Sequence, residues 1–144
     1  MKSTKERFIH TTCSLLEIQG YHGTGMNQII EESGAPKGSL YYHFPDGKVQ
    51  LAVEAVHLAG DNTADLIQEN FPADIPLPKA VREFVLGIAN QVEKSDYQSG
   101  SPLTAVAMET ANTHQVLNLA CREAFSRIET AFQERLDSAG VPSQ

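Results

Sequence analysis

The sequence predicts an all-α protein, and three observations support this fold class. Apolar residues recur every three to four positions along several stretches, which is the spacing of one face of a helix. Glycine- and proline-containing segments separate these stretches, at residues 34–36, 70–78 and 95–102. No stretch has the pattern expected of a strand. The longest such apolar stripe consists of Leu117, Cys121, Phe125, Ile128, Phe132 and Leu136.

Length and composition fit one or two small globular domains. The chain has 144 residues, of which 41% are hydrophobic and 20% charged. No apolar run approaches the roughly 20 residues of a membrane helix, and no signal sequence opens the chain. With Cys13 and Cys121 as the only cysteines, no disulfide framework is implied. We therefore expect a protein of the reducing cytoplasm without a membrane partner.

The first predicted helix begins at a capping box, in which Ser3 is the cap and Glu6 stands three residues later. It is expected to end at Gly20. Its apolar stripe is Phe8, Thr12, Leu15, Leu16 and Gln19. Three basic residues at its start, Lys2, Lys5 and Arg7, suit either an arm that touches phosphate or a solvated helix end.

Two short helices joined by a tight turn follow. Met26, Ile29 and Ile30 give the first an apolar face, and Gly34-Ala35-Pro36 ends it. The second begins at Pro36-Lys37 and stops at about Phe44, before Pro45. Thr24 precedes the first, where its hydroxyl could cap the helix or bind a phosphate. This is the layout of a helix-turn-helix.

The second short helix separates apolar from polar side chains. Leu40 and Phe44 lie one turn apart and are expected in the core. The polar residues face elsewhere, where lysine suits phosphates and hydroxyl or imidazole groups can reach base edges. Tyr41 could equally be partly packed. The candidate DNA-binding residues are Thr24, Asn27, Lys37, Gly38, Ser39, Tyr41, Tyr42, His43 and Lys48.

Four further helices are predicted, the first of which connects the helix-turn-helix to the rest. Their ranges are about 48–69, 78–94, 102–110 and 113–139, with loops at 70–78 and 95–102. The helix at 78–94 is expected to have one apolar face, made of Val81, Phe84, Val85, Ile88 and Val92. Gly140 and Pro142 end the last.

The net charge of −7 is unevenly distributed. Residues 1–48 carry five basic and five acidic side chains, whereas the remaining 96 carry six basic and thirteen acidic ones. Phosphate would therefore repel the C-terminal part and not the N-terminal part, so one copy should bind phosphate weakly.

The run GYHGTGMNQIIEESGAPKGSLYYHF, followed by a lysine and VQLAVEAV, resembles the N-terminal domain of TetR-family transcriptional repressors. The resemblance covers about residues 7–58 and is most specific at 34–44. Pro45-Asp46-Gly47 makes the spacing to Lys48 one residue longer than the commonest one, which is similar to the YxaF/LmrA-type branch. Members of that branch resemble repressors of drug-resistance and detoxification operons.

The resemblance implies a DNA-binding domain at residues 1–48 and a helical effector-binding and dimerisation domain at 49–144. It further implies a homodimer, double-stranded operator DNA as partner and a small lipophilic effector. Candidate effector-binding residues are Phe84, Ile88, Met108 and Phe125, which could equally be plain core. The family usually has two more helices that pair between subunits. Either the sequence is truncated where these would begin, or dimerisation uses another surface.

Other functions lack their motifs. No zinc-finger, HExxH or calcium-loop spacing occurs, so no metal or other cofactor is expected. The P-loop, dinucleotide-binding, GxSxG and SxxK patterns are also missing, which argues against an enzyme. The remaining alternative is a helical ligand- or protein-binding module whose helix-turn-helix is only structural.

Overall fold

The computed structural model describes residues 2–72, 74–98 and 100–141, and every regular element in that part of the chain is a helix. The all-α prediction is confirmed. The helices in chain order are α1 (Thr4–Gly23), α2 (Met26–Ser33), α3 (Lys37–His43), α4 (Lys48–Asn70), α5 (Leu77–Lys94), α6 (Pro102–Thr110) and α7 (Gln115–Ser138).

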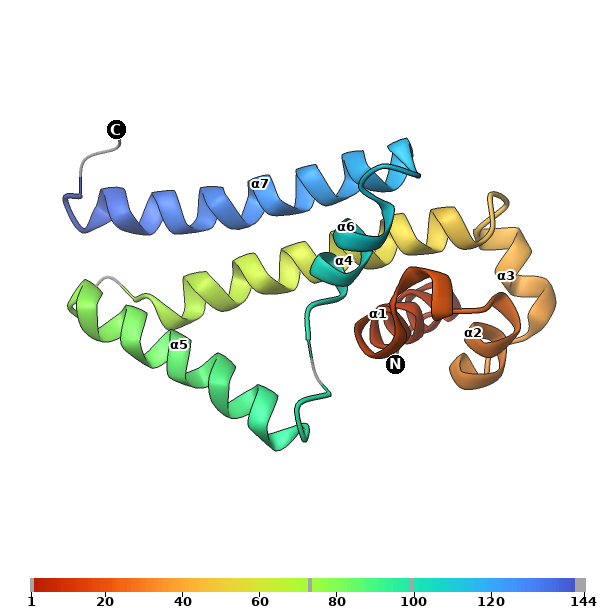
Figure 1. The fold of residues 1–144 in the computed structure, drawn as a ribbon, viewed down its shortest axis with the longest axis horizontal. Coiled ribbons are helices and arrows are strands. Elements are labelled where there is room, and N and C mark those ends of the chain that lie inside the picture. Colours follow the sequence, from red (N-terminus) through yellow and green to blue (C-terminus); the bar gives the residue numbers. More distant parts are fainter. Residues whose placement is uncertain (1, 73, 99, 142–144) are drawn as a thin grey trace.

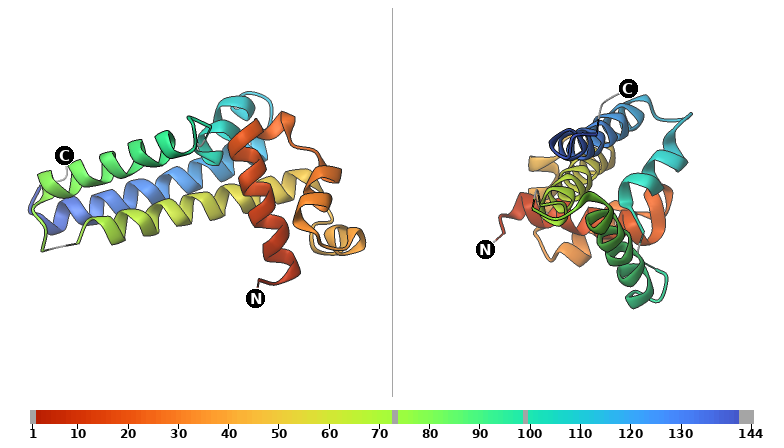
Figure 2. Two further views of the ribbon diagram at one scale, coloured as in Figure 1. Left: turned by 90° about the horizontal axis from the view of Figure 1, so that it is seen from below. Right: turned by 90° about the vertical axis from the view of Figure 1, so that its left-hand side faces the viewer.

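Two long helices form the body of the molecule. α4 and α7 lie side by side and run in the same direction, while α5 returns along α4 and diverges from it (Figures 1 and 2). α1 crosses near the start of α4 and is covered by α6. α2 and α3 lie beyond α1, so that α3 occupies one end of the long axis (Figure 1).

α4 and α7 approach closely because small residues line their contact. Gly60 on α4 faces Ala124 on α7, and a Cβ atom built on Gly60 would lie 2.7 Å from the Ala124 Cβ. Ion pairs flank the contact, with Arg127 Nε 2.6 Å from Asp61 Oδ1 and His57 Nε2 3.1 Å from Glu123 Oε2. Backbones this close let the two helices bury apolar surface along most of their length. Besides Ala124, the small residues buried around the contact are Ala52, Ala55, Ala59, Ala120 and Cys121.

Two further apolar clusters lie at the ends of the molecule. One joins α1, α2, α3 and the start of α4 through Phe8, Ile29, Leu40, Phe44 and Leu51, all of which are fully buried. The other, at the opposite end, contains Ile67, Phe71, Ala80 and Ala131, with Phe84 and Phe132 packed edge-on against Phe71. α4 contributes to both clusters and therefore connects them.

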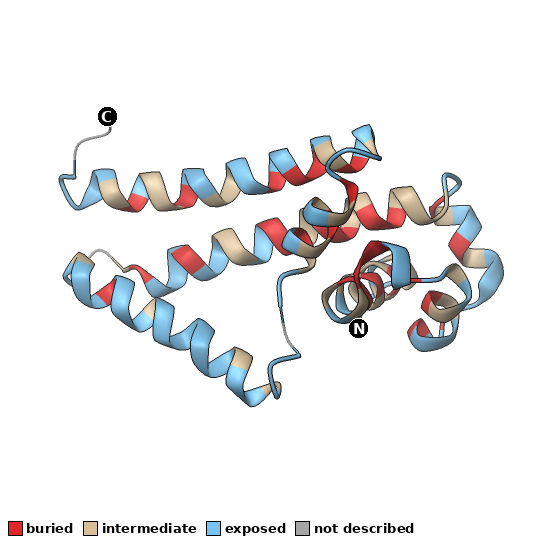
Figure 3. Cartoon of the chain, in the orientation of Figure 1, coloured by how far each residue is buried: buried red, intermediate tan, exposed pale blue. Residues whose placement is uncertain are grey.

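The predicted apolar stripes are confirmed for the N-terminal helices and only in part for α5 and α7 (Figure 3). On α5, Val81, Val85 and Ile88 of the expected buried face are exposed, and Ala80 is the buried residue. On α7, Phe125 is 45% exposed, because the neighbouring Ala124 makes the contact with α4. The close helix contact selects small side chains over the large ones that periodicity emphasises.

Helix boundaries differ from prediction by a few residues. α1 continues past the expected end at Gly20 to Gly23, although Gly20 itself is not helical (φ 71°, ψ −176°). α7 begins at Gln115, two residues later than expected, because residues 111–113 form a turn. In residues 2–72, 74–98 and 100–141, the helices are too short or too polar to cross a bilayer.

The contact at Gly60 predicts opposite effects for two glycine-to-alanine substitutions. Gly60→Ala should lower the free energy of unfolding by about 1–3 kcal/mol, because the new methyl group would meet Ala124, whose Cα would lie 3.0 Å away and cannot rotate aside. Gly87→Ala, at a helical position of α5 with nothing within 4 Å, should raise it by about 0.5–1 kcal/mol. Urea denaturation of both variants checks this. A G60A protein as stable as G87A would contradict the close helix contact.

Candidate nucleic-acid interface

The turn between α2 and α3 is fixed by hydrogen bonds at its first residues. Gly34 adopts the left-handed conformation (φ 59°), and its N–H donates to the carbonyl of Glu31. The Ser33 hydroxyl accepts the N–H of Ala35 at 3.3 Å. Arg7 of α1 donates through Nη2 to the Ser33 carbonyl at 2.6 Å. The end of α2 is thus bound to α1, which defines where α3 begins.

α3 is held by the two residues predicted to anchor it. Leu40 and Phe44 are both fully buried, and the Phe44 ring packs edge-on against Phe8 with their centroids 6.2 Å apart. A helix of seven residues is unstable alone in water, so these contacts maintain it. The prediction that Leu40 and Phe44 face the core is confirmed.

The outer side of α3 exposes the polar residues. Tyr42 is 82% exposed and Tyr41 50%, and Lys37 and Gly38 are also exposed. Ser39 and His43 are partly exposed, with the His43 ring edge-on to Tyr42 at 5.1 Å. This face offers a cation, a hydroxyl, two phenols and an imidazole, groups that donate to phosphates and to base edges.

Asn27 is exposed on the neighbouring helix α2. Its amide can donate and accept, as contact with a base edge or a phosphate requires. The outer side of α3 and Asn27 therefore form the candidate DNA-binding surface.

The basic residues at the start of α1 are largely engaged within the protein. Lys5 Nζ lies 3.0 Å from Glu54 Oε1 of α4. Arg7 donates to the Ser33 carbonyl, as described above. Lys2 is the residue of this basic group that is exposed and could contact a phosphate. For Lys5 and Arg7 the structure favours a role in packing α1 against its neighbours.

The prediction for Thr24 is wrong. Gly25 is the N-cap of α2 and makes no side-chain capping bond, while the Thr24 side chain is 1% exposed. Its hydroxyl donates to the Gly20 carbonyl at 2.7 Å. Because the hydroxyl is buried and donates to this carbonyl beside the bend at Gly20, it neither caps α2 nor lies open to a phosphate.

Lys48 has different surroundings from those expected. Its ammonium lies 4.3 Å from the centroid of the Tyr21 ring rather than on an open surface beside α3. Partial burial lowers the pKa of Lys48, and the attraction of Glu109 on α6 opposes that shift. Lys48 therefore contacts Tyr21 at the end of α1 and is attracted by the Glu109 carboxylate of α6.

The four candidate effector-binding residues do not share one environment. Phe84 packs with Phe71 and Phe132 at the end of the molecule remote from α3. Ile88 on α5 and Phe125 on α7 are each 45% exposed, and Met108 on α6 is 80% exposed. Periodicity places all four on apolar stripes but does not define which stripes face a common space.

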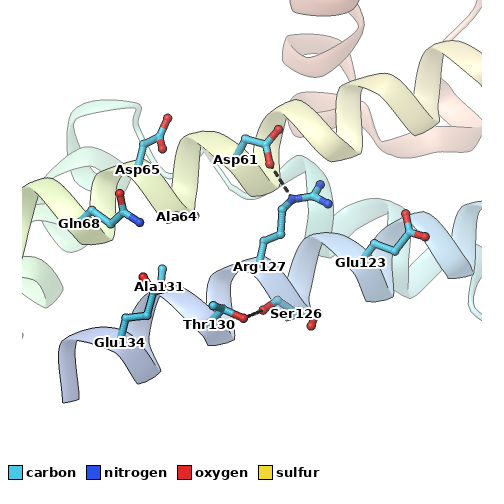
Figure 4. A pocket seen from close by; sticks show the side chains of 10 residues that line it. All are labelled: Asp61, Ala64, Asp65, Gln68, Glu123, Ser126, Arg127, Thr130, Ala131 and Glu134. Carbon is cyan, nitrogen blue, oxygen red and sulfur yellow. Dashed lines mark hydrogen bonds and ion pairs between the residues drawn. The ribbon is translucent and has the colours of Figure 1, made fainter. Parts of the chain in front are cut away.

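The structure instead forms an open groove of about 570 Å³ between α4 and α7. Figure 4 shows carboxylates of both helices around it, with Arg127 reaching across to Asp61. None of the four candidates lines it. Its lining is Asp61, Ala64, Asp65, Gln68, Glu123, Ser126, Arg127, Thr130, Ala131 and Glu134.

Metal-ligating side chains are not gathered in the described part of the chain, and both cysteines are protonated thiols. Within it, no three His, Cys, Asp or Glu side chains gather closely enough to hold a metal ion. Burial raises the pKa of Cys13 to about 11, and burial also raises the pKa of Cys121. Both cysteines are therefore neutral thiols at physiological pH.

Two family models match the chain. Residues 8–55 match "Bacterial regulatory proteins, tetR family", and residues 78–144 match "Transcriptional regulator LmrA/YxaF-like, C-terminal domain". The chain is 39% identical over 141 residues to the uncharacterized HTH-type transcriptional regulator YxaF of Bacillus subtilis, covering 98% of this chain and 74% of that protein. It is 37% identical over 137 residues to the HTH-type transcriptional regulator LmrA of the same organism, covering 95% and 73%.

Solved structures share the fold at lower sequence identity. The regulatory protein TetR from Rhodobacter sphaeroides superposes with a TM-score of 0.79 at 18% identity, covering 92% of this chain and 72% of that one. The reduced form of E. coli NemR gives a TM-score of 0.81 at 17% identity, covering 93% and 69%. Helix order and packing are thus retained where most side chains differ.

Loss of the Arg7 hydrogen bond should destabilise the protein more than loss of a positive charge alone. Arg7→Met should lower the free energy of unfolding by about 1.5 kcal/mol, because the Ser33 carbonyl loses a charged donor. Lys2→Met removes a nearby exposed cation and should change it by less than about 0.5 kcal/mol. Thermal and urea unfolding of the two variants measure the difference. Equal stability of both would exclude Arg7 as a support of the α2–α3 turn.

Proposed function

The chain belongs to the TetR family of DNA-binding transcriptional regulators, and we propose that it is a homodimeric repressor released from its operator by a small lipophilic effector. The observation that carries the proposal is the exposed polar face of α3, behind which Leu40 and Phe44 are fully buried. The resistance or detoxification class of its target operon rests on the resemblance to the YxaF/LmrA branch.

In this proposal α3 enters the major groove with its polar face toward the bases. Lys37 donates to a phosphate, and Tyr42 and His43 contact base edges or backbone oxygens. Gly38 has open space beyond its Cα, so the DNA backbone can approach the helix there. Tyr41, Ser39 and Asn27 complete the contact. Thr24 is excluded by its burial, and Lys48 contributes only if it leaves the Tyr21 ring.

Two copies are needed for useful affinity. Residues 1–48 are electrically balanced, and the rest of the chain carries the whole net charge of −7. A single α3 with one exposed lysine would bind weakly against that background. Regulators of this family usually act as dimers, which place two recognition helices in successive major grooves about 34–36 Å apart. A cytoplasmic location, as predicted from the sequence, would give access to chromosomal DNA.

We assign DNA binding to residues 1–48 and effector binding with dimerisation to 49–144, connected by α4. α4 contributes Leu51 to the apolar cluster behind α3 and Ile67 to the cluster at the opposite end of the molecule. A tilt of α4 would therefore change the packing of both clusters. α5 presents Val81, Val85 and Ile88 partly uncovered, which supports an apolar effector. A coupling of about 1–3 kcal/mol between the two events would weaken operator binding 5- to 150-fold.

Selection of duplexes from a genomic fragment pool with the full chain, followed by gel shift at several salt concentrations, tests the proposal. A repressor should select a two-fold symmetric site and bind it with a steep salt dependence. A ligand- or protein-binding module with a purely structural helix-turn-helix would select no sequence.

Lys37→Ala combined with His43→Ala should reduce affinity for the selected duplex on the order of 100-fold or more, because each dimer loses contacts in both half-sites. Lys79→Ala combined with Lys94→Ala removes two exposed cations of α5 and should leave affinity within about threefold, because both lie outside the proposed DNA-binding face. Circular dichroism and melting temperature monitor folding of both variants. Unchanged operator affinity in K37A/H43A would remove α3 as the DNA-binding surface.

A further inference from the structure

α1 is broken at Gly20, immediately before the helix-turn-helix. The backbone there has φ 71° and ψ −176°, and residues 21–23 form a separate helical turn. The first N–H groups of a helical segment have no acceptor within it. The N–H groups of the turn at 21–23 are therefore available to water or to an acceptor from another helix.

Glu109 of α6 supplies that acceptor. Its Oε2 accepts the N–H of His22 at 2.8 Å, across 87 positions of the sequence. The carboxylate lies against Gly20, where any Cβ atom would overlap Oε1. The positive φ of Gly20 favours glycine, and the missing Cβ leaves room for this carboxylate. Glu109 caps the second segment of α1 from a distant helix.

Further contacts hold residues 20–24, here called the α1–α2 junction. The Tyr21 ring is 6% exposed and packs edge-on against the His114 ring, with centroids 5.6 Å apart. Lys48 Nζ of α4 lies over the same Tyr21 ring, 4.3 Å from its centroid. Thr24 closes the junction by donating to the Gly20 carbonyl. Gly25, the N-cap of α2, follows directly.

We propose that Glu109 is a positioning residue, which couples α6 to the helix-turn-helix by capping the α1–α2 junction. The proposal rests on the proposed function, since it concerns how α3 is displaced from DNA. A hydrogen bond tolerates only a few tenths of an ångström of extension, so a shift of α6 larger than the Glu109 side chain can follow either moves residues 21–23 or breaks the cap. Two residues separate the junction's helical turn from α2, and a movement there reaches α2 and α3 at once.

Coupling of this kind is reciprocal, which makes it measurable without the effector. Binding of the selected duplex to α3 should change amide hydrogen exchange in α6 (residues 102–110) of the wild-type chain. Glu109→Ala should abolish that change while α2 and α3 still become protected. In the absence of DNA, the same variant should accelerate exchange of the His22 amide by tenfold or more.

Two variants separate the hydrogen bond from other effects. Glu109→Gln keeps an oxygen that accepts the His22 N–H, and it should restore both the slow His22 exchange and the response of α6. Glu129→Ala removes an exposed carboxylate of α7 and should behave as wild type. Glu109→Asp keeps the charge on a shorter side chain and replaces E109A if that variant fails to fold.

The outcomes distinguish the proposal from the function on which it rests. A wild-type response of α6 in E109A, or no α6 response in a wild-type chain that binds DNA, would overturn the coupling. An E109Q protein that behaves like E109A would attribute the effect to charge and overturn the cap. If no duplex is bound at all, the proposed function fails, and unaltered His22 exchange in DNA-free E109A would still overturn the cap by itself.

Discussion

The arrangement of the molecule depends on the close contact of α4 with α7 at Gly60 and Ala124. α4 reaches from the apolar cluster behind α3 to the opposite end of the molecule, and it packs along α7 through small side chains and two flanking ion pairs. Leu51 at its start completes the core behind α3. The orientation of the candidate DNA-binding face therefore follows from a helix contact that contains none of its residues.

Much of the fold could be predicted from sequence because local signals were strong. The capping box at Ser3, the Gly34-Ala35-Pro36 turn and the anchors Leu40 and Phe44 each act within a few residues and are found as expected. The buried faces of α5 and α7 could not be predicted, because they depend on which partner helix approaches and how closely. Periodicity emphasised Phe125 and Ile88, whereas the contacts use alanine and glycine.

The candidate DNA-binding residues likewise include some whose surroundings could be predicted from sequence and others whose surroundings could not. Exposure of Lys37, Tyr41 and Tyr42 follows from the helical spacing of Leu40 and Phe44. The surroundings of Thr24, Arg7 and Lys48 do not, since each is determined by a long-range contact or by the bend at Gly20. A glycine followed by aromatic residues, as at Gly20-Tyr21, gave no local indication that a carboxylate 87 positions away from His22 would complete the turn.

Contact between α3 and the DNA can be measured from backbone amide chemical shifts during titration with the selected duplex. If α3 binds the DNA, the largest changes will occur at residues 37–43 and at Asn27, with smaller ones along α4 and α6. Changes concentrated on α5 or α7, with residues 37–43 unmoved at saturation, would contradict it.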